Sequence, residues 1–145
     1  MKVGIKKLNK DAKIPVYGSK YAAGADLYAC LEEPLVIAPG CTAVVPTGVA
    51  LELPVGYAGL IYARSGLATK QGLAPANKVG VVDCDYRGEV MVALYNHSAE
   101  ARTVNSGDRI AQLVITPYIT ADFEECAELS DTERGAGGFG STGSK

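Results

Sequence analysis

The stretch that decides the fold is residues 35–63, LVIAPGCTAVVPTGVALELPVGYAGLIYA, in which apolar runs alternate with Pro- and Gly-containing breaks. The runs are Leu35–Ala38, Ala43–Leu53 and Ala58–Ala63. Short apolar runs bounded by residues that accept turn dihedrals are typical of β-strands. This stretch therefore predicts three consecutive strands joined by tight turns.

The same rhythm continues through the rest of the chain. Further apolar runs of strand length lie at Val79–Val82, Val90–Tyr95, Ile110–Ile115 and Tyr118–Phe123. Only residues 65–71 look helical, with Ser65 as the expected N-cap and Gly72 as the terminator. Because no long amphipathic helix interrupts the runs, the sequence predicts an all-β sandwich or barrel.

Composition indicates one domain and narrows the partners. The chain has 145 residues, of which 48% are hydrophobic and 21% charged, with a formal net charge of -2. This charge argues against a basic face for nucleic acid. No apolar run approaches the ~18 residues of a membrane helix, and the N-terminal MKVGIKK is not followed by the apolar stretch of a secretion signal. We therefore expect a cytoplasmic protein that binds neither nucleic acid nor membrane.

The cysteine pattern argues against a structural zinc site. Cys30, Cys41, Cys84 and Cys126 are widely spaced without a CxxC pair, and His97 is the only histidine. An intracellular chain usually keeps its thiols reduced, so we expect all four to be free.

The C-terminal residues differ in character from the rest. From Asp131 onward glycine is frequent, and little apolar surface is left to offset the entropy of ordering. We expect a core over residues 1–130 and a flexible Gly-rich arm over residues 131–145. The formal G-x-G-x-x-G at residues 135–140 is rejected as a dinucleotide site, because no long helix follows it.

Two carboxylates, Asp83 and Asp85, follow the run Val79–Val82. Strand alternation would point them to the same side, where they could share a metal ion or raise one pKa. The alternative is a strand end capped by two turn-forming residues. With the sole histidine in an unremarkable turn, a general base in this chain is expected to be one of these carboxylates.

Five segments, taken in order, closely resemble the five motifs of the trimeric dUTPase family. They are Ala23–Leu27, Ala63–Leu67, Val79–Glu89, Gly107–Leu113 and the glycine-rich RGAGGFGSTG of residues 134–143. One departure is Ala63, where the family usually has Pro before the arginine of its second motif. The resemblance implies a jelly-roll-like distorted β-barrel with one short helix, assembled as a homotrimer whose active sites are shared between subunits.

The resemblance also implies an activity. Family members hydrolyse dUTP to dUMP and pyrophosphate by Mg²⁺-assisted attack of water on the α-phosphorus, which limits uracil incorporation into DNA and supplies dUMP for dTMP synthesis. Asp83 is the implied base for the water, and Asp26 is implied to reach Mg²⁺ through water. Tyr86 is implied to pack under the deoxyribose and exclude a ribose 2′-hydroxyl.

The remaining substrate contacts follow from the same motifs. Contacts to the base and sugar are implied for Asn77, Gly80, Val81, Val82, Asp83, Tyr86 and Met91, in a segment that resembles the family's uracil-binding hairpin. Contacts to the phosphates are implied for Arg64, Ser65, Gly66 and Gln112. Contacts from the arm are implied for Arg134, Phe139, Gly140, Ser141 and Thr142, with Phe139 stacking on uracil and Arg134 pairing with the γ-phosphate.

Two other functions are compatible with a related fold or site. A dCTP deaminase has a related fold, but its second motif carries further polar residues where this chain has Gly66-Leu67-Ala68. A catalytically silent nucleotide-binding protein is disfavoured by the intact Asp83 and the complete arm.

Overall fold

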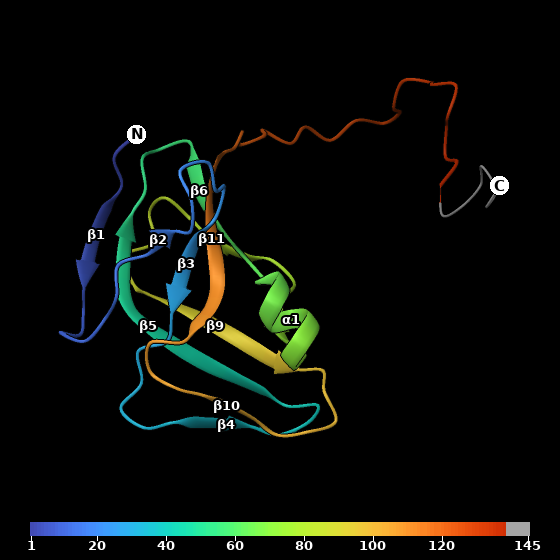
Figure 1. Ribbon diagram of the computed structural model, residues 1–145. Coiled ribbons are helices and arrows are strands. Elements are labelled where there is room, and N and C mark those ends of the chain that lie inside the picture. The colour runs from blue at the N-terminus through green and yellow to red at the C-terminus, as the bar shows by residue number, and fades with distance from the viewer. Residues whose placement is uncertain (139–145) are drawn as a thin grey trace.

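The computed structural model describes residues 1–138, and residues 139–145 lie outside the described part. Its body consists of antiparallel strands and one short helix (Figure 1). The elements in chain order are β1 (Gly4–Lys7), β2 (Val16–Tyr17), β3 (Ala25–Tyr28), β4 (Leu35–Ile37), β5 (Thr42–Glu52), β6 (Tyr57–Tyr62), α1 (Ser65–Gln71), β7 (Leu73–Pro75), β8 (Gly80–Val82), β9 (Glu89–Asn96), β10 (Arg102–Val104) and β11 (Arg109–Pro117).

The strands form two main sheets and a small outlying pair. One sheet has the order β1-β5-β9-β7, the other has the order β2-β3-β11-β6-β8, and β10 pairs with β4. Each strand pairing is antiparallel. The predicted all-β, jelly-roll-like class with one short helix is therefore confirmed.

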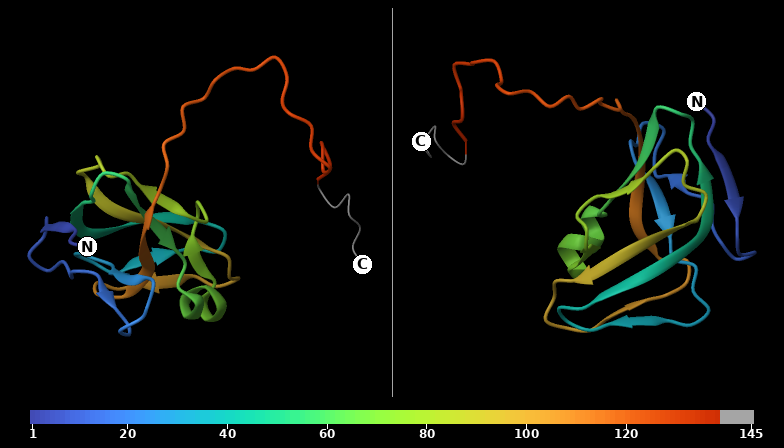
Figure 2. Two further views of the ribbon diagram at one scale, coloured as in Figure 1. Left: turned by 90° about the horizontal axis from the view of Figure 1, so that it is seen from above. Right: turned by 180° about the vertical axis from the view of Figure 1, so that it is seen from behind.

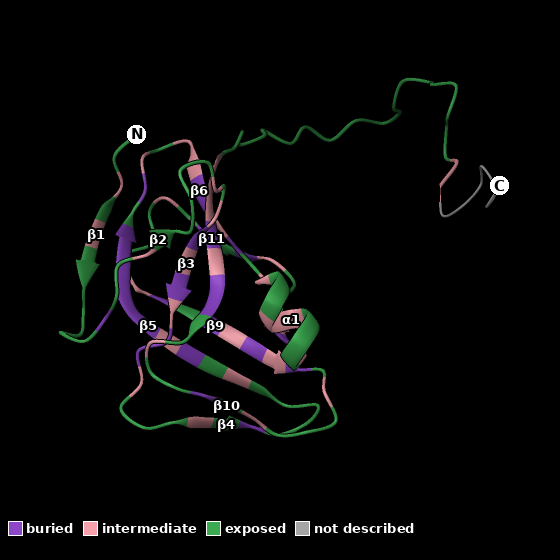
Figure 3. Cartoon of the chain, viewed as in Figure 1, coloured by how far each residue is buried: buried purple, intermediate pink, exposed green. Residues whose placement is uncertain are grey.

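The core lies between the two main sheets and is built by strand alternation (Figure 3). In β9, Val90, Val92 and Leu94 are buried, whereas the residues between them are more exposed. Leu27 and Leu113 meet them from the other sheet within the same core cluster. Every second side chain of these strands thus faces inward, and the inward-facing side chains of both sheets form one continuous apolar cluster.

A bulge in β5 fixes the beginning of β9. Pro46 pairs with Met91 and Ala50 with Glu89, so the intervening residues of β5 oppose a single residue of β9. The backbone N–H of Gly48 donates to Glu89 Oε1 (2.7 Å), and Thr47 Oγ1 donates to the carbonyl of Val90 (2.5 Å). Gly48 has a φ of 70°, which favours glycine. The bulge therefore holds the first two residues of β9 from the neighbouring strand.

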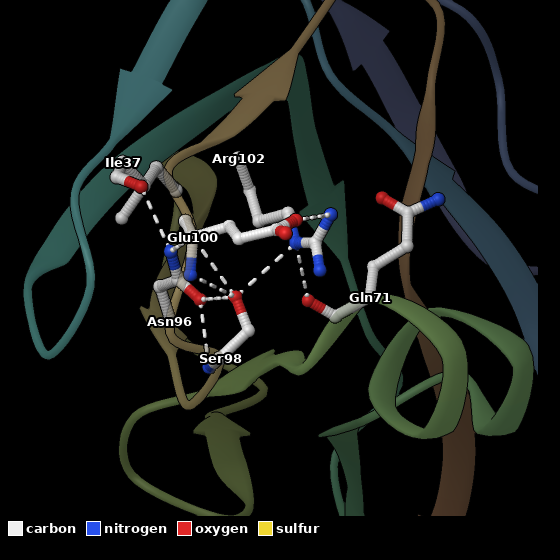
Figure 4. Close-up of polar contacts among 6 residues, drawn as sticks. All are labelled: Ile37, Gln71, Asn96, Ser98, Glu100 and Arg102. Carbon is white, nitrogen blue, oxygen red and sulfur yellow. Dashed lines mark hydrogen bonds and ion pairs between the residues drawn. The ribbon is translucent and has the colours of Figure 1, made fainter.

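A polar network attaches the end of α1 to the strands around it (Figure 4). Asn96 is fully buried and donates from Nδ2 to the carbonyl of Ile37 (2.9 Å), while Ser98 Oγ donates to Asn96 Oδ1 (2.7 Å). Arg102 donates from Nε both to Ser98 Oγ (3.2 Å) and to the carbonyl of Gln71, the last residue of α1 (2.9 Å). Side-chain bonds thus tie the helix to β9, β10 and β4.

The helix lies where the sequence predicts it, but its N-cap differs. Arg64, with extended backbone dihedrals, is the N-cap and provides no side-chain capping bond, so the prediction of Ser65 as the cap is wrong. Ser65 is instead the first helical residue, and its carbonyl accepts a bond from Thr69 Oγ1 (2.7 Å). Gly72 ends the helix in the left-handed conformation (φ 70°), as predicted.

The predicted strand at Tyr118–Phe123 is wrong. The last strand ends at Pro117, and residues 118–138 form no strand or helix. Figure 2 shows this segment extending away from the body, and Ile119 and Phe123 are 93% and 94% exposed. No strand of the described chain pairs with the segment, so its apolar composition alone does not make it a strand. The predicted division at residue 130 stays a prediction.

Candidate active site

A pocket of about 250 Å³, here called the nucleoside pocket, lies beside β8 and the beginning of β9. It brings together the residues that the resemblance assigns to the base and sugar. Its lining consists of Ile61, Asn77, Gly80, Val81, Val82, Asp83, Tyr86, Glu89, Val90 and Met91. The sequence prediction missed Glu89 as a wall residue, although it belongs to the third motif.

A tight turn presents Asp83 to this pocket. β8 ends at Val82, and the N–H of Tyr86 donates to the carbonyl of Asp83 (3.2 Å). Asp83 and Asp85 are both exposed, whereas Cys84 packs against the core cluster. Because the two aspartates lie in a turn and not in a strand, strand alternation does not place them on one side. Asp83 lines the pocket and Asp85 does not.

β8 is an edge strand of its sheet. β8 pairs with β6 on one side, whereas β7 pairs with β9 in the other sheet, so residues 77–83 do not form a paired hairpin as the resemblance implies. The turn before β8 contains Lys78 at a φ of 67°. An edge strand leaves a row of backbone N–H and C=O groups without a strand partner. Such a row can pair with the polar edge of a planar base.

A second pocket of about 230 Å³, here called the phosphate pocket, lies where β3, β11 and the beginning of α1 meet. Its lining consists of Gly18, Ala22, Gly24, Asp26, Arg64, Ser65, Gly66, Arg109 and Gln112. The sheet register explains this grouping, because Gln112 of β11 is paired with Asp26 of β3 on one side and with Tyr62 of β6 on the other. Residues of the first, second and fourth motifs are thereby placed side by side.

Two arginines and one carboxylate dominate the electrostatics of the phosphate pocket. Arg64 Nε contacts Asp26 Oδ1 at 2.7 Å, and Arg109 Nη1 contacts Asp26 Oδ2 at 3.3 Å. Gln112 Nε2 donates to the carbonyl of Ala63 (2.9 Å), which fixes the amide beside the helix. Two guanidinium groups against one carboxylate leave an excess of positive charge, which suits a polyphosphate. The sequence prediction missed Arg109, although it stands in the fourth motif.

The arm residues are not brought to either pocket within the described chain. Arg134 is exposed and donates from Nε to the carbonyl of Gly137 (2.9 Å). Phe139, Gly140, Ser141 and Thr142 lie outside the described residues. The nucleoside and phosphate pockets have no lining residue in common.

The cysteines and other titratable groups form no further centre in residues 1–138. No group of three or more His, Cys, Asp and Glu side chains gathers there as a metal site, and the four cysteines form no disulfide there. Burial raises the pKa of Cys30, with the nearby Asp11 and Glu89 adding to the effect. A hydrogen bond with Cys84 (3.4 Å) raises the pKa of the exposed Tyr118 hydroxyl. None of the helices described here is long and apolar enough to cross a membrane.

Comparison with known proteins decides the family. The sequence model of the dUTPase family matches residues 10–143. The chain is 52% identical over 143 residues to a deoxyuridine 5'-triphosphate nucleotidohydrolase of Nautilia profundicola, covering 99% of both chains. It is 49% identical over 141 residues to the protein of the same name from Syntrophotalea carbinolica, covering 97% of this chain and 96% of that one. The chain belongs to the dUTPase family.

Solved structures agree with this assignment. A staphylococcal bacteriophage 80alpha dUTPase mutant with dUpNHpp superposes with a TM-score of 0.86 at 30% identity, covering 98% of both chains. A dUTPase mutant from phage phi11, whose structure concerns the coordination of a structural Mg(II) ion, gives a TM-score of 0.78 at 27% identity, covering 88% of this chain and 98% of that one. Membership of the dUTPase family makes this chain a hydrolase of the dUTP diphosphatase class.

Proposed function

We propose that this chain hydrolyses dUTP to dUMP and pyrophosphate, and so limits uracil incorporation into DNA and supplies dUMP for dTMP synthesis. The observation that carries the proposal is the pairing of two sites. One pocket joins an edge strand, an aromatic ring and an exposed carboxylate, and the other joins two arginines with a helix start. A base with a sugar fits the first, and a polyphosphate fits the second.

Asp83 is the proposed general base. Its exposed carboxylate lies on the wall of the nucleoside pocket. We assign to it the water that attacks the α-phosphorus of the nucleotide. The carboxylate takes the proton of that water as the oxygen attacks, and the pyrophosphate leaves from the opposite side. Positioned bases of this kind typically contribute about 10²- to 10⁴-fold in rate.

The phosphate chain is proposed to be bound by five residues of the phosphate pocket: Arg64, Ser65, Gly66, Arg109 and Gln112. These residues position the phosphates and neutralise their charge, which is most of what phosphoryl transfer requires of a protein. Asp26 is the single carboxylate among the residues that line this pocket, and both of its oxygens already contact arginines. This donor set fits a Mg²⁺ ion held mainly by the phosphates, with Asp26 reaching it through water. When bound, Mg²⁺ neutralises charge on the phosphate oxygens.

Selection of deoxyuridine is proposed to lie in the nucleoside pocket. The edge of β8, together with Asn77, offers fixed donors and acceptors that fit uracil and reject cytosine. We propose that contacts to the base along this edge also exclude the methyl group of thymine. Tyr86, with Met91 nearby, packs against the deoxyribose and leaves no room for a 2′-hydroxyl.

The active unit is proposed to be a homotrimer with shared sites. The lining residues of the two pockets do not overlap within one chain, which is compatible with sites built from two chains. Ile119, Phe123 and Leu129 are at least 88% exposed along the departing segment, which suits a segment covered by another copy. Arg134 and residues 139–142 of the arm are proposed to close over the nucleotide, with Phe139 on uracil.

One assay tests the activity. Pyrophosphate and ammonia release are measured with dUTP, dCTP, dTTP and UTP, each with Mg²⁺. We expect pyrophosphate from dUTP alone and no ammonia from any nucleotide. Ammonia from dCTP would instead indicate a deaminase, and binding of dUTP without turnover would indicate a silent nucleotide-binding protein. A cytoplasmic location stays a prediction from the sequence.

A further inference from the structure

The ring of Tyr86 lies directly against the backbone of Gly88. A Cβ atom added to Gly88 would lie 2.4 Å from Tyr86 Oη, 2.5 Å from Cζ and 2.9 Å from Cε2. These distances are shorter than carbon atoms of a folded protein tolerate, so a side chain at position 88 must displace the ring tip. Because the contact is with the far end of one side chain, the ring can move while the backbone stays in place.

The wall around this ring is otherwise held firmly. Tyr86 Oη donates to the carbonyl of Glu89 (3.0 Å), and Glu89 Oε1 accepts from the N–H of Gly48 in the β5 bulge (2.7 Å). The buried Thr47 donates to the carbonyl of Val90, the next wall residue. The bulge therefore fixes the beginning of β9, and the ring tip is held to it by the bond to Glu89 and lies in the space beside Gly88.

We propose that Gly88 is a positioning residue that sets how far the Tyr86 ring projects into the nucleoside pocket. Tyr86 lines the pocket and Gly88 does not, so a side chain at position 88 acts on the sugar site through the ring that it displaces. The absence of a side chain at position 88 thus determines the width of the sugar site. This inference rests on the proposed function, in which the deoxyribose of dUTP packs against Tyr86.

The test is a double-mutant cycle of Gly88→Ala and Tyr86→Ala, with kcat and KM measured for dUTP. Gly88→Ala is expected to raise KM about tenfold or more, because overpacking of a fitted site typically costs that much in affinity. Its kcat should stay within about threefold, since Asp83 is unchanged. In the Tyr86→Ala background the Gly88→Ala change should leave KM unaltered, because no ring remains to displace.

Gly18→Ala is the matched control. An added Cβ at Gly18 meets no atom within 4 Å, and Gly18 lines the phosphate pocket and not the nucleoside pocket. Because dUTP and UTP carry the same phosphates, any effect of Gly18→Ala on KM should be equal for the two nucleotides, and the preference for dUTP over UTP should stay unchanged. Thermal melting of all variants monitors folding. Any loss of melting temperature caused by Gly88→Ala should be absent when the same change is made in the Tyr86→Ala background.

Three results would overturn the inference. They are an unchanged KM in Gly88→Ala, an equal rise in KM in the Tyr86→Ala background, and a folding defect that Tyr86→Ala does not relieve. Each of these leaves the proposed function standing, because the unsubstituted chain still hydrolyses dUTP. Absence of dUTP turnover by the unsubstituted chain would overturn the proposed function itself and this inference with it.

Discussion

Asp83 and Asp85 are two carboxylates of one turn that the structure distinguishes, since only Asp83 lines the nucleoside pocket. Asp83→Asn is expected to lower kcat by about 10²- to 10⁴-fold while dUTP affinity stays nearly unchanged, because the amide keeps the shape but cannot accept a proton. Steady-state kinetics together with equilibrium binding of dUTP measure the two effects. Asp85→Asn is the matched control and should retain near-normal turnover. A comparable loss of kcat in both variants would contradict the assignment of Asp83 as the general base.

The four thiols should differ in their rates of alkylation. Cys41 and Cys126 are exposed, Cys84 packs against the core and contacts Tyr118, and Cys30 is buried. Burial raises the pKa of Cys30, so less of it is thiolate at neutral pH than of an ordinary thiol.

Iodoacetamide at pH 7.5, followed by peptide mass spectrometry, should therefore modify the exposed Cys41 well before the buried Cys30. Because its pKa is raised, the alkylation rate of Cys30 should still increase as the pH is raised well above neutrality. Modification of Cys30 in step with Cys41 would contradict the burial argument, and unfolding in denaturant should equalise the four thiols.

At the level of strands and helices, the sequence predicted elements that carry their own signal. Long apolar runs such as Ala43–Leu53 correspond to observed strands, and Gly72 ends the helix as predicted. Strands β1, β2, β3, β7 and β10 were missed because they are short and gain stability from pairing. Arg102–Val104, for instance, has one buried residue and is a strand because it pairs with β4. Conversely, Tyr118–Phe123 has a strand-like composition and no partner.

The candidate site shows the same contrast between residues marked by a local sequence pattern and residues placed by strand pairing. The residues that the resemblance assigns to the base and sugar line one pocket, and their roles there stay a prediction. Arg109 was missed because its contact with Asp26 depends on the register between β11 and β3, which includes an irregularity after Arg109. Glu89 was missed because its anchor is a bulge in another strand. Contacts created by pairing over long sequence separation leave no local pattern to read.

The end of α1 offers a test at this scale. Gly72→Ala is expected to lower the free energy of unfolding by about 1–3 kcal/mol, because Gly72 has a φ of 70° and an added Cβ would lie 2.9 Å from the N of Ser98. Urea denaturation followed by circular dichroism measures the loss. Gln71→Ala is the control, since the exposed Gln71 contributes only its carbonyl to Arg102 and should change stability by less than about 0.5 kcal/mol. Equal stability of the two variants would show that the helix end is not constrained.

For the whole molecule, the proposed sharing of sites predicts complementation between inactive chains. One variant carries Asp83→Asn with an intact arm, and the other ends at Thr132 with Asp83 intact. The two variants are refolded together in equal amounts. If the arm closes a neighbour's site, about a quarter of the sites then contain both an intact Asp83 and an intact arm, and dUTP hydrolysis reappears.

Each variant refolded alone is the control and should stay inactive. Mass spectrometry of the intact assemblies verifies that mixed trimers have formed. Mixed trimers without activity above that of the two parents would rule out donation of the arm from one subunit to another.

The proposed division of each site between the nucleoside pocket of one chain and the phosphate pocket of another has a consequence for gene dosage. If neither pocket alone performs the reaction, then the number of working sites follows the concentration of trimer and not that of chain. By mass action, below the dissociation range of the assembly this number falls with the third power of chain concentration. A modest drop in expression would then remove most of the activity, and dilution of the purified enzyme would lower its activity per milligram.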